Sequence, residues 1–147
     1  MNPSDPDQLW RTAAQLLNSA DAEKRAVEAL RLCLQALRSL GSESDRSLRA
    51  NLLQTASVAS SYIDLNEAIR FGYDALAILD RDGPPIMATM LRDSLARDLR
   101  KAGRHEEAER LTNQAGRILD TMEERLARTK ATLQRRKHKK WWQVWKG

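Results

Sequence analysis

Small residues recur along this chain at intervals of 42 and 40 positions, and this recurrence restricts the fold more than any other feature. When Ala26, Ala68 and Ala108 are aligned, the neighbouring positions fall into register without further gaps. Small side chains let two helices approach closely, and large aliphatic side chains fill the grooves between them. The sequence therefore predicts three successive units that pack in the same way. The other positions in register are Ala14, Ala56 and Ala96; Cys33, Ala75 and Ala115; and Leu37, Leu79 and Leu119.

Each unit is expected to consist of two helices. Aromatic residues make up only 5% of the chain, whereas strands favour aromatic and β-branched residues, so an all-α fold is predicted. Apolar residues follow each other at the three- and four-residue spacing of amphipathic helices. The first helix is expected to begin near residue 5, and the others to cover about residues 22–40, 46–61, 65–79, 86–101 and 105–140.

Several helix ends carry their own signals. Asp5, which a proline follows, is a typical N-cap, and Gly41 is expected to end the second helix in a left-handed conformation. Asp64 and Glu67 have the residue types and spacing of a capping box. Residues 82–85, with the sequence Asp-Gly-Pro-Pro, must lie between helices, because two consecutive prolines do not fit inside one.

The segment 95–109 has the pattern Leu-Ala-x2-Leu-x3-Gly-Arg-His-Glu-Glu-Ala-Glu. This pattern resembles the helix–turn–helix core of the tetratricopeptide repeat (TPR) family, with residues 66–69 as a weaker version. Trp10 stands where the family often has its first-helix tryptophan. The resemblance covers about residues 7–120 and implies a TPR-like α-solenoid of three helix pairs, at about 5–41, 45–81 and 85–120. An ordinary helical bundle with Ala and Leu seams is the alternative.

The first two units depart from the TPR pattern. Asp21 and Ile63 stand where a turn glycine is expected in the first and second units. Gly72 occupies a position that usually carries a large side chain. The resemblance therefore leaves the turn geometry of these two units open.

Few residues have the chemistry of a catalytic or metal site. Cys33 shares its register position with two alanines, so a buried, unreactive thiol is expected. His105 lies at a predicted helix start, far from His138, and no metal-ligand spacing or phosphate-binding glycine loop is present. We therefore expect a protein that is not an enzyme and has no cofactor. The absence of a long apolar run and of a signal segment predicts a cytoplasmic location.

The TPR resemblance implies a concave groove lined by the first helix of each pair. Carried over by register, the groove is small and neutral at one end and positive at the other, which suits a peptide or helix with an acidic end. The carboxylate clamp of chaperone-binding TPR proteins is not reproduced, because Met90 and Ser94 stand where that clamp needs cations. The alternative is that the charged side of the first helix in the third unit is simply exposed to solvent and binds no partner. The predicted partner-binding residues are Arg11, Gln15, Asn18, Leu53, Ser57, Arg97, Arg100 and Lys101.

Positive charge is concentrated in the last part of the chain. Residues 1–120 have 16 Lys/Arg and 18 Asp/Glu, giving −2, whereas residues 121–147 have nine Lys/Arg and two Glu, giving +7. We expect a basic helix over 121–140 and a Trp-rich tail over 141–147. The spacing of its aliphatic residues predicts either a capping helix that folds back on the third unit or a short coiled-coil dimer. We call these residues the aliphatic stripe; they are Leu119, Met122, Leu126, Thr129 and Leu133.

The final segment RRKHKKWWQVWKG combines cations with three of the four tryptophans. If exposed, it suits an anionic membrane surface, a single-stranded nucleic acid or a protein that reads a short motif. Docking onto the repeats is another interpretation, and WWQVWKG also loosely resembles the modified segment of a ribosomal precursor peptide, which would make a modifying enzyme its partner. We expect an adaptor with two binding elements. The candidate tail residues are Arg135, Arg136, Lys137, Lys139, Lys140, Trp141, Trp142 and Trp145.

Overall fold

The structure is a computed structural model that describes residues 5–41 and 45–146. These residues form six helices and no strand, which confirms the all-α prediction. The chain divides into two compact units, residues 1–115 and 116–147. The helices are α1 (Pro6–Leu17), α2 (Ala22–Ser39), α3 (Arg46–Ser60), α4 (Leu65–Asp82), α5 (Pro85–Lys101) and α6 (His105–Trp145).

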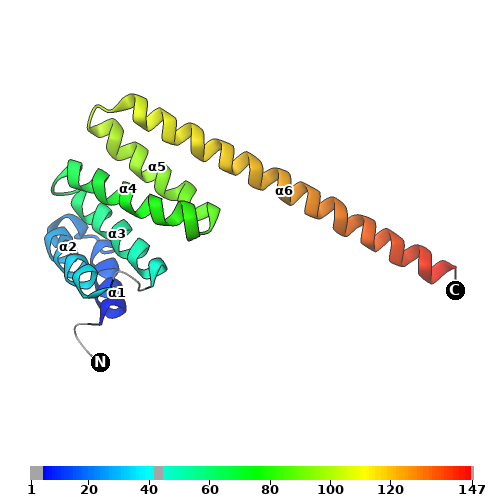
Figure 1. The fold of residues 1–147 in the computed structure, drawn as a ribbon, viewed down its shortest axis with the longest axis horizontal. Coiled ribbons are helices and arrows are strands. Elements are labelled where there is room, and N and C mark those ends of the chain that lie inside the picture. The colour runs from blue at the N-terminus through cyan, green and yellow to red at the C-terminus, as the bar shows by residue number, and fades with distance from the viewer. Residues whose placement is uncertain (1–4, 42–44, 147) are drawn as a thin grey trace. The chain divides into compact units, whose positions relative to one another are not determined.

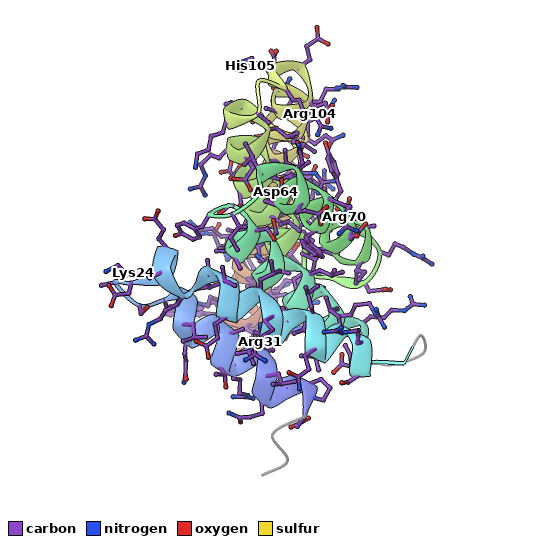
Figure 2. The ribbon with its side chains drawn as sticks, turned by 90° about the vertical axis from the view of Figure 1, so that its left-hand side faces the viewer. Lys24, Arg31, Asp64, Arg70, Arg104 and His105 are labelled. Atoms are coloured by element: carbon purple, nitrogen blue, oxygen red, sulfur yellow. The ribbon has the colours of Figure 1, made fainter. Side chains whose placement is uncertain are left out.

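In the first unit each helix packs against the next one along the chain, from α1 to α5, and α1 also contacts α3 (Figure 1). The turns inside the three helix pairs lie on one side. Figure 2 views that side, with Lys24 beside the first turn, Asp64 at the second, and Arg104 and His105 at the third. Successive pairs therefore have the same orientation in this unit.

Two clusters of buried apolar side chains hold the first unit together. One cluster joins α1, α2, α3 and α4 around residues such as Leu32, Leu52 and Phe71. The other joins α3, α4, α5 and the first turns of α6 around Leu95 and Leu99. Because α3 and α4 contribute to both clusters, they form the centre of the unit.

The recurring small residues lie mainly at helix contacts. Ala26, Ala68 and Ala108 are all 0% exposed, and Cys33, Ala75 and Ala115 are at most 3% exposed. The expectation of burial is wrong at three positions, one of which is Leu37, which is only partly buried. Ala14 in the first helix is only half-buried, and Leu119 is 40% exposed, because no helix after α6 covers it in the part of the chain that the structure describes.

Most helix ends follow the sequence signals. The carboxylate of Asp64 accepts hydrogen bonds from the backbone N–H groups of Asn66 and Glu67 at 3.0 and 3.4 Å. The side chain of Glu67 instead binds Arg70, so only half of the capping box forms. The break predicted over residues 82–85 is shorter than expected, because Asp82 ends α4, Pro84 is the N-cap of α5 and Pro85 begins that helix.

The left-handed glycine is Gly103 and not Gly41. Gly103 has φ +79°, its N–H donates to Arg100 O at 3.0 Å, and the N–H of Arg104 donates to Leu99 O at 2.8 Å. These two bonds form a Schellman motif, which turns α5 sharply into α6. The prediction for Gly41 is wrong because α2 ends at Ser39 and Leu40 is already extended.

At Gly72, α4 approaches its neighbours closely. A Cβ atom at this position would lie 2.8 Å from Leu95 Cδ1 on α5 and 3.4 Å from Ser57 Oγ on α3. The large side chain usual in the TPR pattern would not fit between these helices. The chain therefore departs from the TPR pattern at Gly72 because the neighbouring helices leave no room for a large side chain.

α6 runs without a turn from His105 to Trp145. It passes through Gly116 and ends beyond the predicted limit near residue 140, so the tryptophans lie on a helix and not in a separate tail. Within the described residues no turn separates the predicted capping segment from the rest of α6. Lys, Arg and Gln are good helix formers, which explains how the cationic segment continues the helix.

Candidate functional site

The outward face of α5 carries the positive charge that the sequence places there. Arg97, Arg100 and Lys101 are exposed, as are Met90 and Asp93 at the helical spacing that puts them on the same face. The guanidinium of Arg100 donates to Thr112 Oγ1 of α6 at 2.8 Å. Arg97 and Lys101 are exposed beside the buried Asp98 carboxyl, whose pKa they act to lower.

The predicted residues of α1 are also exposed. Arg11, Gln15 and Asn18 lie at i, i+4 and i+7 and so follow one face of the helix. Arg11 Nε pairs with Asp7 Oδ2 one turn earlier, at 2.7 Å. Beside them, Trp10 Nε1 donates to Thr55 Oγ1 of α3 at 3.1 Å, so this indole anchors α1 to α3.

On α3 the predicted positions face the interior. Ser57 is 6% exposed and donates to Ala68 O of α4 at 2.7 Å, and Leu53 packs against both apolar clusters. Their assignment to an open groove is therefore corrected. α3 has neighbours on several sides, so only a narrow strip stays open, and Val58, one position from Ser57, is 40% exposed.

A polar cluster that the sequence analysis missed links α4, α5 and α6. Arg92, only 8% exposed, donates to both carboxylate oxygens of Asp80 at 2.7 Å and to Gln114 Oε1 at 3.2 Å. A bidentate pair of this kind is strong and directional. The only available signal was an arginine at a position where the helical pattern expects an apolar residue.

The same cluster ties the start of α6 to α4. Tyr73 Oη donates to Glu107 Oε2 at 3.0 Å, and Arg104 donates to both oxygens of Glu107. The hydrogen bond from Arg104 is the main cause that lowers the pKa of Glu107, while burial and then Glu107 raise the pKa of Tyr73. Tyr73 and Glu107, together with Asp80, Arg92 and Gln114, line an open hollow of about 430 Å³. Its polar groups already bind each other, so the cluster is explained by packing.

The remaining candidates for chemistry are inert or isolated. Cys33 is 0% exposed, and burial raises the pKa of its thiol to about 12, as expected for a structural cysteine. His105 is exposed at the first position of α6. Among the described residues no group of three His, Cys, Asp or Glu side chains is arranged to hold a metal ion, and no helix is both long and apolar enough to cross a membrane.

The end of α6 gathers three indoles on one face. Trp141, Trp142 and Trp145 are 68%, 60% and 79% exposed. Together with His138 they line one surface hollow, because residues three and four apart are neighbours on a helix. We call these four residues the aromatic face.

Lysines flank the aromatic face on both sides. Lys137 and Lys140 lie beside Trp141, and Lys139 and Lys146 lie beside Trp142. The ammonium of Lys146 is 5.4 Å from the centre of the Trp142 ring, within cation–π range. The other two candidate cations, Arg135 and Arg136, are exposed one turn earlier. All eight tail residues predicted from the sequence therefore lie on one short exposed stretch of helix.

The aliphatic stripe lies on another side of this helix. Leu126 and Leu133 are 70% and 53% exposed and are one heptad apart, and helical geometry turns them away from the middle of the aromatic face by roughly 100° or more. The second unit thus presents a weak aliphatic stripe and a separate aromatic, cationic end. No family model, curated protein or solved structure matches this chain.

Proposed function

We propose that this protein is a non-enzymatic interaction module with two binding elements. The first is a TPR-like array of three helix pairs that binds a peptide or helix through the exposed faces of α1 and α5. The second is the cationic, tryptophan-rich end of α6, which docks on a second partner or an anionic surface. Such a chain acts as an adaptor, because it brings two partners together.

The observation that carries the proposal is the repeated placement of buried small residues in pairs of one orientation. Ala26, Ala68 and Ala108 are fully buried at equivalent positions, and the turns of the three pairs lie on one side (Figure 2). Stacked helix pairs bury their faces against each other and leave extended surfaces that suit peptide binding. The exposed cations Arg97 and Lys101 favour an acidic partner.

The distribution of charge supports a separate role for the end of α6. Residues 1–115 carry 15 Lys/Arg and 17 Asp/Glu, whereas residues 135–146 carry six Lys/Arg and no Asp/Glu. Exposed tryptophans beside these cations favour a binding surface, since large aromatic side chains dominate binding energies. The two regions differ in chemistry, so we expect each of them to bind its own partner.

Affinity purification of the full-length chain from its native host tests the proposal. One variant, Arg97→Glu with Lys101→Glu, changes the face of α5, and a second, Trp141→Ser with Trp145→Ser, changes the end of α6. We expect each variant to lose a different set of co-purifying molecules. The losses caused by the α5 variant should be those that salt also weakens in the wild type.

A matched control reverses two charges elsewhere on the first unit. Lys24→Glu with Arg31→Glu has the same change of net charge but lies on α2 (Figure 2). It should retain every partner, and circular dichroism should show wild-type helicity in all variants. If the α5 and α6 variants lose the same partners, or lose none, the adaptor proposal is wrong.

A further inference from the structure

The aromatic face has the geometry of a helix that lies at a bilayer surface. At about 100° per residue, His138, Trp141, Trp142 and Trp145 span an arc of roughly 100°. The three indoles are 60% to 79% exposed. Indole rings are favoured at the depth of lipid headgroups, where one edge is apolar and the N–H can bind a polar group.

The cations stand where headgroup phosphates would meet them. Lys137 and Lys140 border Trp141, and Lys139 and Lys146 border Trp142, so ammonium groups flank the indoles on both sides. Long lysine side chains can keep their charges in the headgroup layer while the indoles enter it. Residues 135–146 contain no Asp or Glu that would oppose an anionic surface.

These features favour a bilayer over a nucleic acid. Base stacking needs separately accessible ring faces, whereas the three indoles here line one shared hollow and the Lys146 ammonium lies over the Trp142 ring. A long polyanion would also extend beyond a twelve-residue cationic patch, and residues 1–115 carry a net charge of −2. A planar anionic surface needs only the patch itself.

We propose that the end of α6 binds anionic phospholipid bilayers, with Trp141, Trp142 and Trp145 at headgroup depth and the flanking lysines on lipid phosphates. This inference rests on the proposed function, for which it names the second partner. It also assigns the binding to the aromatic face and not to the aliphatic stripe of Leu126 and Leu133.

Vesicle binding by the full-length chain tests the inference. The protein is mixed with vesicles of phosphatidylcholine alone or with an equal mixture of phosphatidylcholine and phosphatidylglycerol, and bound protein is measured by co-sedimentation. In a Trp10→Phe background the remaining tryptophans all lie at the end of α6, so a blue shift of their fluorescence reports entry into the headgroup layer. We expect binding and a blue shift with the anionic vesicles only, both weakened by salt.

Three double variants locate the binding surface. Trp141→Ser with Trp145→Ser should abolish sedimentation with anionic vesicles. Lys139→Gln with Lys140→Gln should weaken the partition constant on the order of tenfold or more, because each cation near an anionic surface contributes roughly fivefold. Leu126→Ser with Leu133→Ser makes two apolar-to-polar changes outside the aromatic face and should bind like the wild type.

Several results would overturn the inference. These are equal binding to neutral and anionic vesicles, no binding to either, or a leucine variant that loses as much binding as the tryptophan variant. Binding of a single-stranded oligonucleotide without vesicle binding would identify the other partner class. If vesicles fail while the α6 variant still loses protein partners in affinity purification, the bilayer inference is wrong and the proposed function stands.

Discussion

The two parts of α6 show how differently one helix can be stabilised. In residues 105–115 the helix buries Ala108, Leu111 and Ala115, which pack at three- and four-residue spacing in the first unit. From residue 116 onward no described residue of α6 is buried, although Leu119, Met122 and Leu126 continue the same spacing. Helical spacing of apolar residues therefore predicts the helix but does not by itself predict burial.

Stability in the two units has different sources. Side chains buried between helices dominate the first unit, where burial of a large aliphatic residue contributes about 1.5–3 kcal/mol. The second unit relies on backbone hydrogen bonds and on exposed contacts such as the Glu124–Arg128 pair, which is 3.8 Å apart. Pairs of this kind contribute about 0.3–0.5 kcal/mol. Equivalent substitutions in the two units should thus have unequal effects.

The largest contrast is expected for leucine truncation. Leu99 is 0% exposed and Leu126 is 70% exposed. Leu99→Ala should lower the free energy of unfolding by about 2–5 kcal/mol, whereas Leu126→Ala should change it by less than about 0.5 kcal/mol. Urea unfolding followed by circular dichroism measures both. Equal losses would mean that Leu126 is buried against another surface in solution.

Enlarging an alanine tests the repeated contact positions. Ala96 is 0% exposed, so Ala96→Leu should overpack the α5 contacts and cost about 1–3 kcal/mol. Ala127 is exposed, and Ala127→Leu should be close to neutral. Thermal melting compares the two variants. An unchanged melting temperature for Ala96→Leu would show that this residue is not at a helix contact.

Glycine replacement should have opposite signs in the two units. Gly72→Ala gains helix propensity but places Cβ 2.8 Å from Leu95 Cδ1, so we expect a net loss on the order of 1 kcal/mol. Gly116→Ala meets nothing within 4 Å and should raise helicity, with a gain of up to about 1 kcal/mol in local helix stability. Far-ultraviolet circular dichroism and urea unfolding distinguish the outcomes, and a stabilised Gly72→Ala would contradict the close approach.

The smallest effect is expected at Asp98, and it depends on pH. This carboxyl is 7% exposed, and burial raises its pKa above the ordinary value of 3.8, although Lys101 and Arg97 act in the opposite direction. Because the folded state binds the proton more tightly, the carboxyl lowers stability as pH rises through its raised pKa. Asp98→Asn should raise the melting temperature at neutral pH, and the gain should vanish below pH 3.8. A gain that is constant with pH would exclude a charge effect.

Residue types and their spacing were enough to predict much of this fold. The positions of Ala26, Ala68 and Ala108, the proline break before α5 and the unreactive Cys33 followed from local rules. Ser57 did not, because an error of one residue turns a helical side chain by about 100°, here from the surface to the interior. Arg92 was missed because its place inside the protein depends on Asp80 and Gln114, which come from other helices.

In the candidate site, too, some features could be predicted from the sequence and others could not. The sequence identified the three tryptophans and the cations from Arg135 to Lys140, but it missed Lys146 and assigned the tryptophans to a separate tail. Their gathering on one face required the helix to continue to Trp145. The repeat spacing, the helix-forming segments and the separation of charge are properties of the chain itself. Burial was decided only by the tertiary structure, because it depends on which segments approach each other and on how each helix is rotated toward its neighbours.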